Sequence, residues 1–456
     1  AESFGGMGLK KGDRVVLYSE NQPEWGLAYL AATTAGLVVV PLDAQTWEKE
    51  VWGVARFTKA KALLVSSRCF EKLKPSSLQE NENRQMPVKL LDLNRRCEPF
   101  VDTTSPRSTT VDVCSPLPPL PQVFPEDPAS IIFTTGTAAD PKGAVHTHSN
   151  FLDNFLGVNC YLPVQEADQI TSVLPLYHAL EFTCGFLMAI YGGATVTYLH
   201  SLKPKVILGV MREVGATCML GVPTLYALIR DDMERRVMKG TQSSLKSRRL
   251  AISKRFSNIA RHNWGKEIGR QLFARAHKEV GNQIRFFVSG GSALGAELYE
   301  DFQALGLPIY EGYGLTETAP VLTVNPLGES RKGSAGKPLP GVELQIFRPD
   351  EHGVGEVIVQ TSSLMQEYYG NPKATSAVIR NGWFHTGDLG RLDAEGYLYI
   401  TGRIKDVIVT GAGKNVYPAD LEAIYQALPG VAEVCVLGVK SGLTEDVHAI
   451  FAPLQN

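Results

Sequence analysis

Short apolar runs alternate with amphipathic stretches in the first part of the chain. Residues 13–18, 36–42 and 60–65 are rich in Val, Leu and Ala and predict strands, whereas residues 25–34 predict a helix. Strands that alternate with helices are usually parallel, because each helix returns the chain to the edge where the previous strand began. The pattern therefore predicts an α/β body built on a parallel sheet.

The same alternation continues further along the chain and then changes. Residues 192–198 and 216–223 predict strands of a second α/β half, and the proline-rich residues 115–121 predict a linker inside the body. Residues 342–347 and 355–360 alternate apolar and polar positions, which is typical of antiparallel strands with one buried face. We therefore expect two parallel-sheet α/β subdomains followed by a small β-barrel-like subdomain.

Composition narrows the class of protein. With 456 residues the chain exceeds a typical single domain, and its 44% hydrophobic and 20% charged residues are ordinary for a soluble globular enzyme. The net charge of −2 gives no attraction to nucleic acid, so we expect no such partner. Seven cysteines without Cys-x-x-Cys spacing argue against a zinc site and a disulfide framework. Because no apolar run is long enough to span a membrane and no signal peptide is visible, we expect a cytoplasmic protein.

Residues 310–318, Tyr-Glu-Gly-Tyr-Gly-Leu-Thr-Glu-Thr, are the first candidate for chemistry. They place a hydroxyl group and a carboxylate beside an aromatic ring in what reads as a glycine-interrupted turn. The glycines let backbone approach a nucleotide, Tyr313 offers a face for a purine, Thr316 can donate to a phosphate, and Glu317 is a suitable oxygen ligand for Mg²⁺. Read alone, the run is also compatible with an ordinary strand-to-loop turn.

Residues 134–143, Thr-Thr-Gly-Thr-Ala-Ala-Asp-Pro-Lys-Gly, follow a strand-like run at 130–133. Backbone N–H groups and threonine hydroxyls in such a loop can hold phosphate oxygens, and the ammonium group of Lys142 adds a mobile positive charge. The loop is not a Walker motif, because no Gly-Lys-Ser/Thr opens a helix here. By itself it is more typical of a plain Ser/Thr turn.

Two later segments complete a pattern of four. They are residues 383–388, Trp-Phe-His-Thr-Gly-Asp, and residues 401–406, Thr-Gly-Arg-Ile-Lys-Asp. In this order and at this spacing, the four segments resemble the adenylate-forming (AMP-binding) superfamily, which includes acyl-CoA synthetases, peptide-synthetase adenylation domains and firefly-type luciferases. The chain is most similar to the long-chain fatty-acid–CoA ligases, and the resemblance runs from about Gly8 to the C-terminus.

The resemblance implies a two-step reaction. The carboxylate of a medium- or long-chain fatty acid would attack the α-phosphate of ATP, giving acyl-AMP and pyrophosphate, and the thiol of CoA would then displace AMP. The implied cofactors are ATP and Mg²⁺, with CoA as a substrate. Two alternatives stay open: a ligase that delivers an acyl or aryl group to a carrier protein, and a catalytically impaired nucleotide- or acyl-binding homologue.

The resemblance also implies roles for individual residues. The residues that would hold the phosphates are Thr134, Thr135, Gly136, Thr137 and Lys142. Those that would bind AMP are Gly291, Ser292, Glu311, Gly312, Tyr313, Gly314, Asp388 and Arg403. Asp388 would accept from the ribose hydroxyls, Glu317 with Thr134 would bind Mg²⁺, and Thr316 would donate to the α-phosphate. The acyl pocket would include His178, Val222, Gly290 and Leu315.

His178 carries a further expectation. The resemblance places it near the substrate carboxylate, where it would gate the pocket and count among the catalytic residues. A lone histidine beside a proline-containing strand end is equally typical of a structural role.

The resemblance divides the chain into three parts. It implies a catalytic body over residues 1–401, a hinge at 402–406 and a small, mobile α+β C-terminal domain over 407–456. Lys405 stands at the hinge position of the family, although a charged surface turn is the simpler alternative for such a run. The family's C-terminal domain is longer and carries a lysine near its end that is absent here. We therefore expect this domain to be incomplete.

The phosphate loop departs from the family at two positions. Family members usually have Thr-Gly where this chain has Ala138 and Ala139. Ala138 removes a hydroxyl donor, and Ala139 costs ~1 kcal/mol or more if the position requires a positive φ. The departure supports the alternative of an impaired homologue.

Residues 235–278 are dense in Lys and Arg, with Glu267 as the sole acid. Ile252, Phe256 and Ile259 recur within this segment at helical spacing. A basic amphipathic helix can lie on an anionic membrane, so one expectation is peripheral membrane contact. The alternative is a solvated helix pair packed on the body. Long-chain members of the family carry an insertion here, so the segment also favours a long acyl substrate. Among oligomeric states, we favour a dimer.

Overall fold

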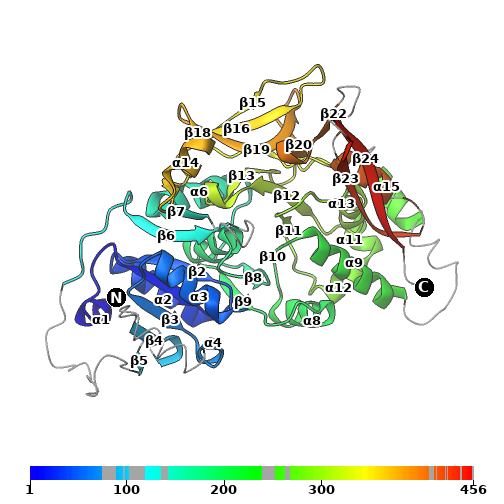
Figure 1. The fold of residues 1–456 in the computed structure, drawn as a ribbon. Helices are drawn as coiled ribbons and strands as arrows, with labels where there is room; N and C mark the ends of the chain where they lie inside the picture. The colour runs from blue at the N-terminus through cyan, green and yellow to red at the C-terminus, as the bar shows by residue number, and fades with distance from the viewer. Residues whose placement is uncertain are drawn as a thin grey trace.

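The chain is organised around three large β-sheets (Figure 1). The structure is a computed structural model that describes residues 1–73, 89–95, 98–101, 119–134, 142–238, 252–261, 268–409, 415–416, 418–426, 428, 430–441 and 444–453. Figure 1 shows the first sheet in blue and cyan, the second in green, and the third above them in yellow and orange. The mixed α/β class expected from the sequence is therefore confirmed.

The first sheet has the strand order β17-β7-β6-β2-β1-β3-β4-β5. Its strands are β1 (Arg14–Tyr18), β2 (Val38–Leu42), β3 (Ala62–Val65), β4 (Lys89–Asp92), β5 (Glu98–Val101), β6 (Pro128–Phe133), β7 (Gly143–Thr147) and β17 (Glu367–Tyr368). Strand β1 is parallel to both β2 and β3, as the alternating pattern predicted. The helical elements of this part are α1 (Glu2–Gly6), α2 (Pro23–Thr34), α3 (Glu48–Phe57), α4 (Ser67–Phe70) and η1 (Leu93–Arg95).

Successive side chains of β1 pack into different layers. Leu17 belongs to the same buried cluster as Trp25 of α2, whereas Val16 belongs to the cluster that contains Val51 of α3. Both faces of the strand are buried, which explains why the strand reads as a continuous apolar run.

The second sheet has the strand order β14-β13-β12-β11-β10-β8-β9. Its strands are β8 (Gln169–Ser172), β9 (Thr195–Tyr198), β10 (Cys218–Gly221), β11 (Phe286–Ser289), β12 (Ile309–Gly314), β13 (Val321–Val324) and β14 (Lys337–Pro338). The strands β8 to β12 are parallel neighbours, and β13 runs antiparallel to β12. The predicted second parallel half is therefore confirmed.

Two layers of helices cover the second sheet. One layer contains α6 (His148–Tyr161), the π-helical turn η2 (Glu181–Leu187) and α7 (Met188–Gly192). The other contains α8 (Pro204–Val214), α9 (Pro223–Met238), α11 (Gly269–Leu272), α12 (Ala274–Glu279) and α13 (Ala296–Ala304). On β11, Phe286 packs into the first layer and Phe287 into the second. The first layer forms one wall of the cavity described below.

The glycine-rich segment beginning at Tyr310 is not a turn, so that part of the sequence interpretation was wrong. Residues up to Gly314 form β12, which pairs with both β11 and β13. A Cβ atom on Gly314 would lie 1.9 Å from the carbonyl oxygen of Pro320, so glycine is required here by the close approach of the neighbouring chain. The turn begins afterwards, in the 3₁₀ helix η3 (Thr316–Thr318).

The third sheet is antiparallel, as the alternating pattern predicted. It contains β15 (Val342–Phe347), β16 (Gly355–Thr361), β18 (Ile379–Arg380), β19 (Trp383–Leu392) and β20 (Leu398–Arg403), with α14 (Pro372–Val378) beside it. Across the described residues this sheet is open and forms no closed barrel. The barrel-like expectation was therefore wrong, because alternation reports which face of a strand is buried and not how a sheet closes.

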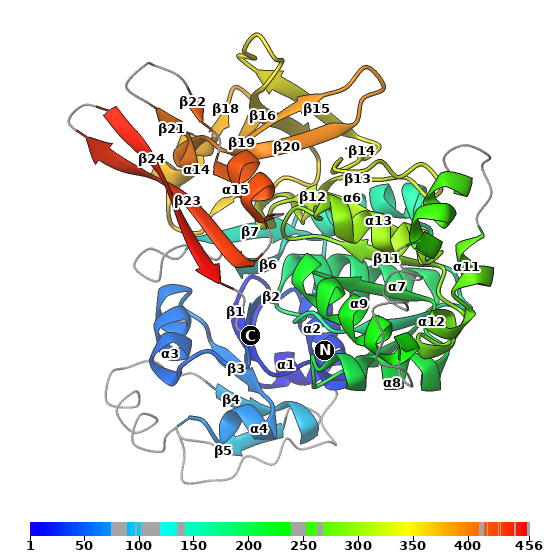
Figure 2. The same cartoon turned by 90° about the vertical axis from the view of Figure 1, so that its right-hand side faces the viewer.

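The C-terminal part follows β20 directly. Its elements are η4 (Ile404–Asp406), β21 (Ile408–Val409), β22 (Asn415–Val416), α15 (Pro418–Gln426), β23 (Val431–Ser441) and β24 (Thr444–Pro453). Figure 2 shows the hairpin of β23 and β24 with α15 against it. The backbone N–H of Val436 donates to Glu422 of α15 at 2.8 Å. The α+β character is as expected, whereas the division into body, hinge and mobile domain stays a prediction.

Parts of the basic segment 235–278 are described. Residues 252–261 form a helix, as the periodicity predicted. Its exposed apolar residues are Ile252, Phe256 and Ile259. Lys254 of the same helix forms an ion pair with Asp301 at 2.7 Å, which supports the alternative of a helix packed on the body. In the described part of the chain, no helix has both the length and the apolar character needed to cross a bilayer. Membrane contact and a dimer stay predictions.

Candidate active site

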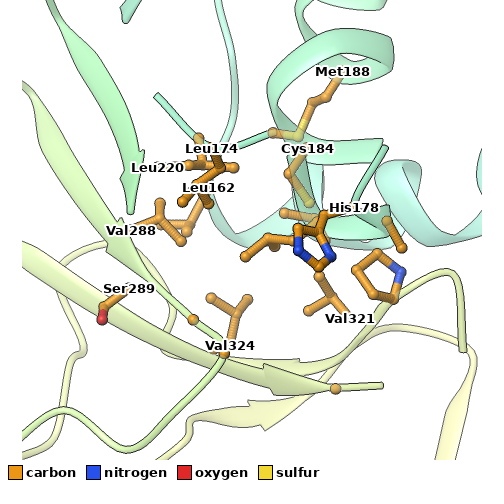
Figure 3. Close-up of a pocket in the computed structure, with 18 of the residues that line it drawn as sticks. Leu162, Leu174, His178, Cys184, Met188, Leu220, Val288, Ser289, Val321 and Val324 are labelled. Carbon is orange, nitrogen blue, oxygen red and sulfur yellow. The ribbon is translucent and has the colours of Figure 1, made fainter. Parts of the chain in front are cut away.

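A cavity of about 320 Å³ lies between the second sheet and its first helix layer. The carboxyl ends of β10, β11 and β12 meet at one edge of this sheet, because these strands are parallel. Figure 3 shows Leu220 and Val288 on the strand side of the cavity and Cys184 and Met188 on the helical side. The cavity therefore runs along the sheet, with one end at the edge where the sequence motifs lie.

The lining of this cavity is almost entirely apolar. Among the described residues that line it, none is Lys, Arg, Asp or Glu. The predicted acyl-pocket residues that line it are His178, Val222, Gly290 and Leu315. Other predicted site residues on its wall are Gly291, Gly312, Tyr313, Gly314 and Thr316. The structure thus brings together residues from four separate segments of the sequence.

His178 lies at the cavity wall, near Val321 (Figure 3). Its backbone N–H donates to the carbonyl oxygen of Pro175 at 3.0 Å, and its ring centroid lies 4.3 Å from that of Tyr177. Burial lowers the pKa of His178, and the nearby charge of Asp43 opposes this only partly. The imidazole is therefore neutral near pH 7 and can offer one donor and one acceptor to a bound ligand.

A buried carboxyl group lies three residues after His178. Glu181 is 1% exposed, and a Cβ atom on Gly185 would lie 2.6 Å from its Oε1, so glycine one turn later makes room for the carboxyl group. Burial raises the pKa of Glu181 to about 8. The folded protein therefore holds this carboxyl group protonated at neutral pH.

We expect Glu181→Gln to flatten the pH dependence of stability. Because the folded-state pKa is raised, the stability that the protonated group contributes is present below its ordinary pKa and is lost as pH rises through about 8, at a rate of roughly 1 kcal/mol per pH unit. Glutamine cannot ionise, so the variant should lose less thermal stability than the wild type between about pH 5 and about pH 8. Thermal unfolding of both proteins across this range is the measurement. If the stability of the two proteins changed with pH in the same way, Glu181 would not be held protonated in the folded protein.

Glu317, Tyr368 and Lys142 form a cluster at the outer end of the site. Oε1 of Glu317 accepts a hydrogen bond of 2.6 Å from the Tyr368 hydroxyl, and Nζ of Lys142 lies 5.2 Å from the centre of the Tyr368 ring. Strand β17 places Tyr368 beside Ala144 of β7, just after the phosphate loop. Burial and the charge of Glu317 both raise the pKa of Tyr368, so its hydroxyl stays a donor. A cation and a carboxylate are thus held around one phenol ring.

The two ends of the phosphate loop lie close together. The backbone N–H of Thr134 donates to the carbonyl oxygen of Lys142 at 2.9 Å, which holds these two residues together at the end of β6. The candidate residues Thr135, Gly136 and Thr137, and the alanines at 138 and 139, lie outside the described residues. Their roles stay predictions.

The backbone of Thr316 is fixed by a buried histidine. Nε2 of His146 lies 2.8 Å from the carbonyl oxygen of Thr316, and burial lowers the pKa of His146 to about 4. The ring is therefore neutral, and Nε2 must carry the proton that it donates to this carbonyl. The backbone N–H of Met365 donates to the carbonyl oxygen of Glu317 at 2.8 Å. The η3 turn is thus held from two sides.

Asp388 forms a second polar cluster, on the third sheet. Its Oδ2 accepts from the Tyr313 hydroxyl at 2.7 Å, and its Oδ1 lies 2.9 Å from Nε of Arg403. The register of β19 and β20 places Asp388 opposite Arg403. Burial raises the pKa of Asp388 and outweighs the lowering by Tyr313, Arg403 and Lys405. Asp388 and Arg403, both expected at the nucleotide site, are therefore paired in the structure, whereas the hydrogen bond from Tyr313 was not predicted.

Three other predicted residues lie away from the cavity wall. The carboxylate of Glu311 is buried and accepts from the backbone N–H of Leu294 at 3.1 Å, and burial raises its pKa to about 7. It therefore supports the loop after β11. Ser292 is exposed on that loop, and Lys405 is exposed in η4.

Sequence reasoning missed His146 and Tyr368. His146 contacts a residue 170 positions away, and Tyr368 contacts one 51 positions away. Tyr368 also lies in a strand of two residues, which has no periodicity to detect. A local motif search has no signal for either residue.

The described residues contain no cluster of three or more His, Cys, Asp or Glu side chains that could hold a metal ion. A single carboxylate such as Glu317 fits a magnesium ion that takes most of its other ligands from phosphates and water. The oxygen donor of Glu317 therefore fits Mg²⁺ that arrives with a nucleotide.

Known proteins resemble this chain in both sequence and fold. The long-chain-fatty-acid–CoA ligase of Escherichia coli O6:H1 is 30% identical over an alignment of 478 positions, and the alignment covers 98% of this chain and 77% of that protein. The ATP-bound crystal structure of MatB from Rhodopseudomonas palustris has a TM-score of 0.77 and 27% identity, covering 99% of this chain and 80% of that one.

A third protein shares the fold at lower identity. The o-succinylbenzoate CoA synthetase MenE from Bacillus subtilis, solved with ATP and a magnesium ion, has a TM-score of 0.76 and 23% identity over 100% of this chain and 82% of its own. The family model described as AMP-binding enzyme matches residues 1–369. The chain therefore belongs to the AMP-binding enzyme family.

Proposed function

We propose that this protein activates a medium- or long-chain fatty acid with ATP and transfers the acyl group to CoA. The observation that carries the proposal is the apolar cavity of about 320 Å³, one end of which lies at Thr316 and the glycines after β11. A fatty acid has one polar end and one apolar end, and the cavity has the same division. The long-chain-fatty-acid–CoA ligase of E. coli supports the same substrate class.

The residues of the site suit the formation of an acyl adenylate. Lys142 and Thr316 would bind the phosphates and orient the α-phosphorus toward the carboxylate that attacks it. The attack forms a carboxyl oxygen–phosphorus bond and breaks the bond to pyrophosphate. Magnesium, when bound with ATP at Glu317, would neutralise charge on the phosphates. Asp388 would accept from the ribose hydroxyls, with Arg403 holding its other oxygen.

The lining of the cavity favours an acid without a second charge. A buried carboxylate or ammonium group costs several kcal/mol when nothing pairs with it. No described residue on the lining offers a Lys, Arg, Asp or Glu side chain for such pairing. Diacids and amino acids are therefore poor substrates. The same fold occurs in MenE, which is named as a CoA synthetase for o-succinylbenzoate, so the fold alone does not select the acid.

The test is acid-dependent exchange of pyrophosphate into ATP, measured over saturated fatty acids of increasing length. We expect exchange with medium- or long-chain acids, and acyl-CoA formation when CoA is added. Succinate and an amino acid serve as matched charged acids and should give background exchange. Exchange that is absent with every fatty acid would refute the proposal.

The same series distinguishes the two alternatives. A carrier-protein ligase would give exchange without acyl-CoA. An impaired homologue, which Ala138 and Ala139 suggest, would bind a fluorescent fatty acid without any exchange.

A further inference from the structure

A polar network lies at the opposite edge of the second sheet from the candidate site. Asp168 immediately precedes β8, Thr217 immediately precedes β10, and Arg285 immediately precedes β11. Because β8, β10 and β11 are parallel neighbours, these three residues meet at the amino edge. Thr316 and the glycines after β11 lie beyond the carboxyl edge.

The network is centred on the carboxylate of Asp168, whose side chain is 2% exposed. Oδ1 accepts from the Thr217 hydroxyl at 2.6 Å, and Oδ2 accepts from the backbone N–H of Gln165 at 2.8 Å and from the guanidinium of Arg285. Burial raises the pKa of Asp168, but the hydrogen bonds from Thr217 and Arg285 bring it below its ordinary value. The carboxylate is therefore ionised and paired. Because it is buried, the loss of one partner would leave its charge incompletely compensated, which is destabilising.

Arg285 extends this network in two further directions. Its Nη2 donates to the carbonyl oxygen of Pro163 at 3.2 Å, and its guanidinium carbon lies 5.2 Å from the centre of the Phe286 ring. One side chain thus joins the segment 163–168 to the start of β11.

Three of the residues in the network are sequence neighbours of residues that line the far end of the cavity. Pro163 lies between the lining residues Leu162 and Val164, Thr217 precedes the lining residue Cys218, and Arg285 precedes the lining residue Phe286. The polar groups themselves are absent from the lining. They therefore lie outside the apolar lining and connect the chain segments that carry the lining residues.

We infer that Asp168, Thr217 and Arg285 close the far end of the acyl cavity and thereby set the longest chain that it accepts. The inference rests on the proposed function, since it assigns the cavity to an acyl chain. From Phe286 to Gly290 the protein backbone advances about 13 Å, at about 3.3 Å per residue. A cavity of this length accommodates about ten methylene groups of an extended acyl chain. Longer acids must displace the segment 163–168, which Arg285 restrains. Arg285 is thus a positioning residue for substrate length.

Arg285→Met is the decisive variant, because methionine keeps apolar contact with Phe286 but cannot pair with Asp168. We expect the ratio of kcat/KM for hexadecanoate to that for decanoate to rise at least about tenfold, the order of discrimination that one methylene group gives in an apolar pocket. Arg285→Lys keeps the positive charge and should return the ratio toward the wild-type value. Thr217→Val keeps the shape of the side chain but removes the hydrogen bond to Asp168 and the one accepted from the backbone N–H of Gln169. Because Arg285 still pairs with Asp168, this variant should give a smaller rise. It is the test of the inference if Arg285→Met does not fold.

Arg331 provides a matched control. It pairs with Asp393 at 2.8 Å and lies 4.0 Å from the centre of the Tyr397 ring, and neither it nor its partners line the cavity. Arg331→Met should lower Tm without changing the chain-length ratio. An unchanged ratio in an active Arg285→Met protein, or in Thr217→Val where Arg285→Met is unfolded, would overturn the inference. Absence of exchange with every fatty acid in the wild type would instead refute the proposed function.

Discussion

Replacing Glu317 by Gln is expected to abolish adenylation while leaving the fold intact. The side chain has nearly the same shape, but the charge beside Lys142 and Tyr368 is lost. A carboxylate that holds Mg²⁺ on the triphosphate neutralises charge that develops in the transition state. We expect a loss of ~10³-fold or more in acid-dependent pyrophosphate exchange, which corresponds to about 4 kcal/mol.

Tyr368→Phe is the control for this change. It removes the hydrogen bond of 2.6 Å to Glu317 but keeps the carboxylate and the ring near Lys142. We expect a loss of ~10-fold, because the carboxylate is then less firmly oriented. Unaltered exchange in Glu317→Gln would remove this residue from the metal and phosphate site.

Cys184→Trp should restrict the protein to short acids. Cys184 is 6% exposed and its side chain points into the cavity from η2 (Figure 3). An indole in place of a thiol fills the space that several methylene groups would occupy, and each excluded methylene group costs about tenfold or more in kcat/KM. For dodecanoate and longer acids the expected loss is therefore ~10³-fold or more, while butanoate loses little. Exchange measured for each acid gives the profile.

Cys160 offers a matched substitution of the same residue type. It is exposed on α6 and does not line the cavity, so Cys160→Trp should leave the chain-length profile unchanged. A Cys184→Trp protein that still activates dodecanoate at the wild-type rate would show that the acyl chain lies elsewhere.

The parallel strands of the first two sheets could be predicted from the sequence because burial on both faces produces short, continuous apolar runs. The runs at β1, β2 and β10 are of this kind, and each strand lies where its run indicated. The open form of the third sheet could not be predicted, because closure depends on strand tilt and register between distant segments.

The residues of the candidate site could also be predicted only in part from the sequence. His178 and Thr316 lie in local motifs, and the structure places both at the cavity. The glycines near Tyr313 misled the interpretation, because a glycine required by a close neighbouring strand has the same sequence signal as a glycine in a turn. Tyr368 could not be found at all, since its role depends on a pairing of β17 with β7 that only the folded chain reveals.

The orientation of the second sheet has a consequence for how this protein can change over evolution. Groups that would act on phosphate lie beyond the carboxyl edge of the sheet, and the network of Asp168, Thr217 and Arg285 lies at the amino edge. The hydrogen bonds and ion pairs described above for the two edges involve different residues, so substitutions at the two edges should combine additively. If the proposed function and the proposed role of Arg285 hold, selection for a new acid can act at the amino edge while the phosphate site at the carboxyl edge is inherited unchanged.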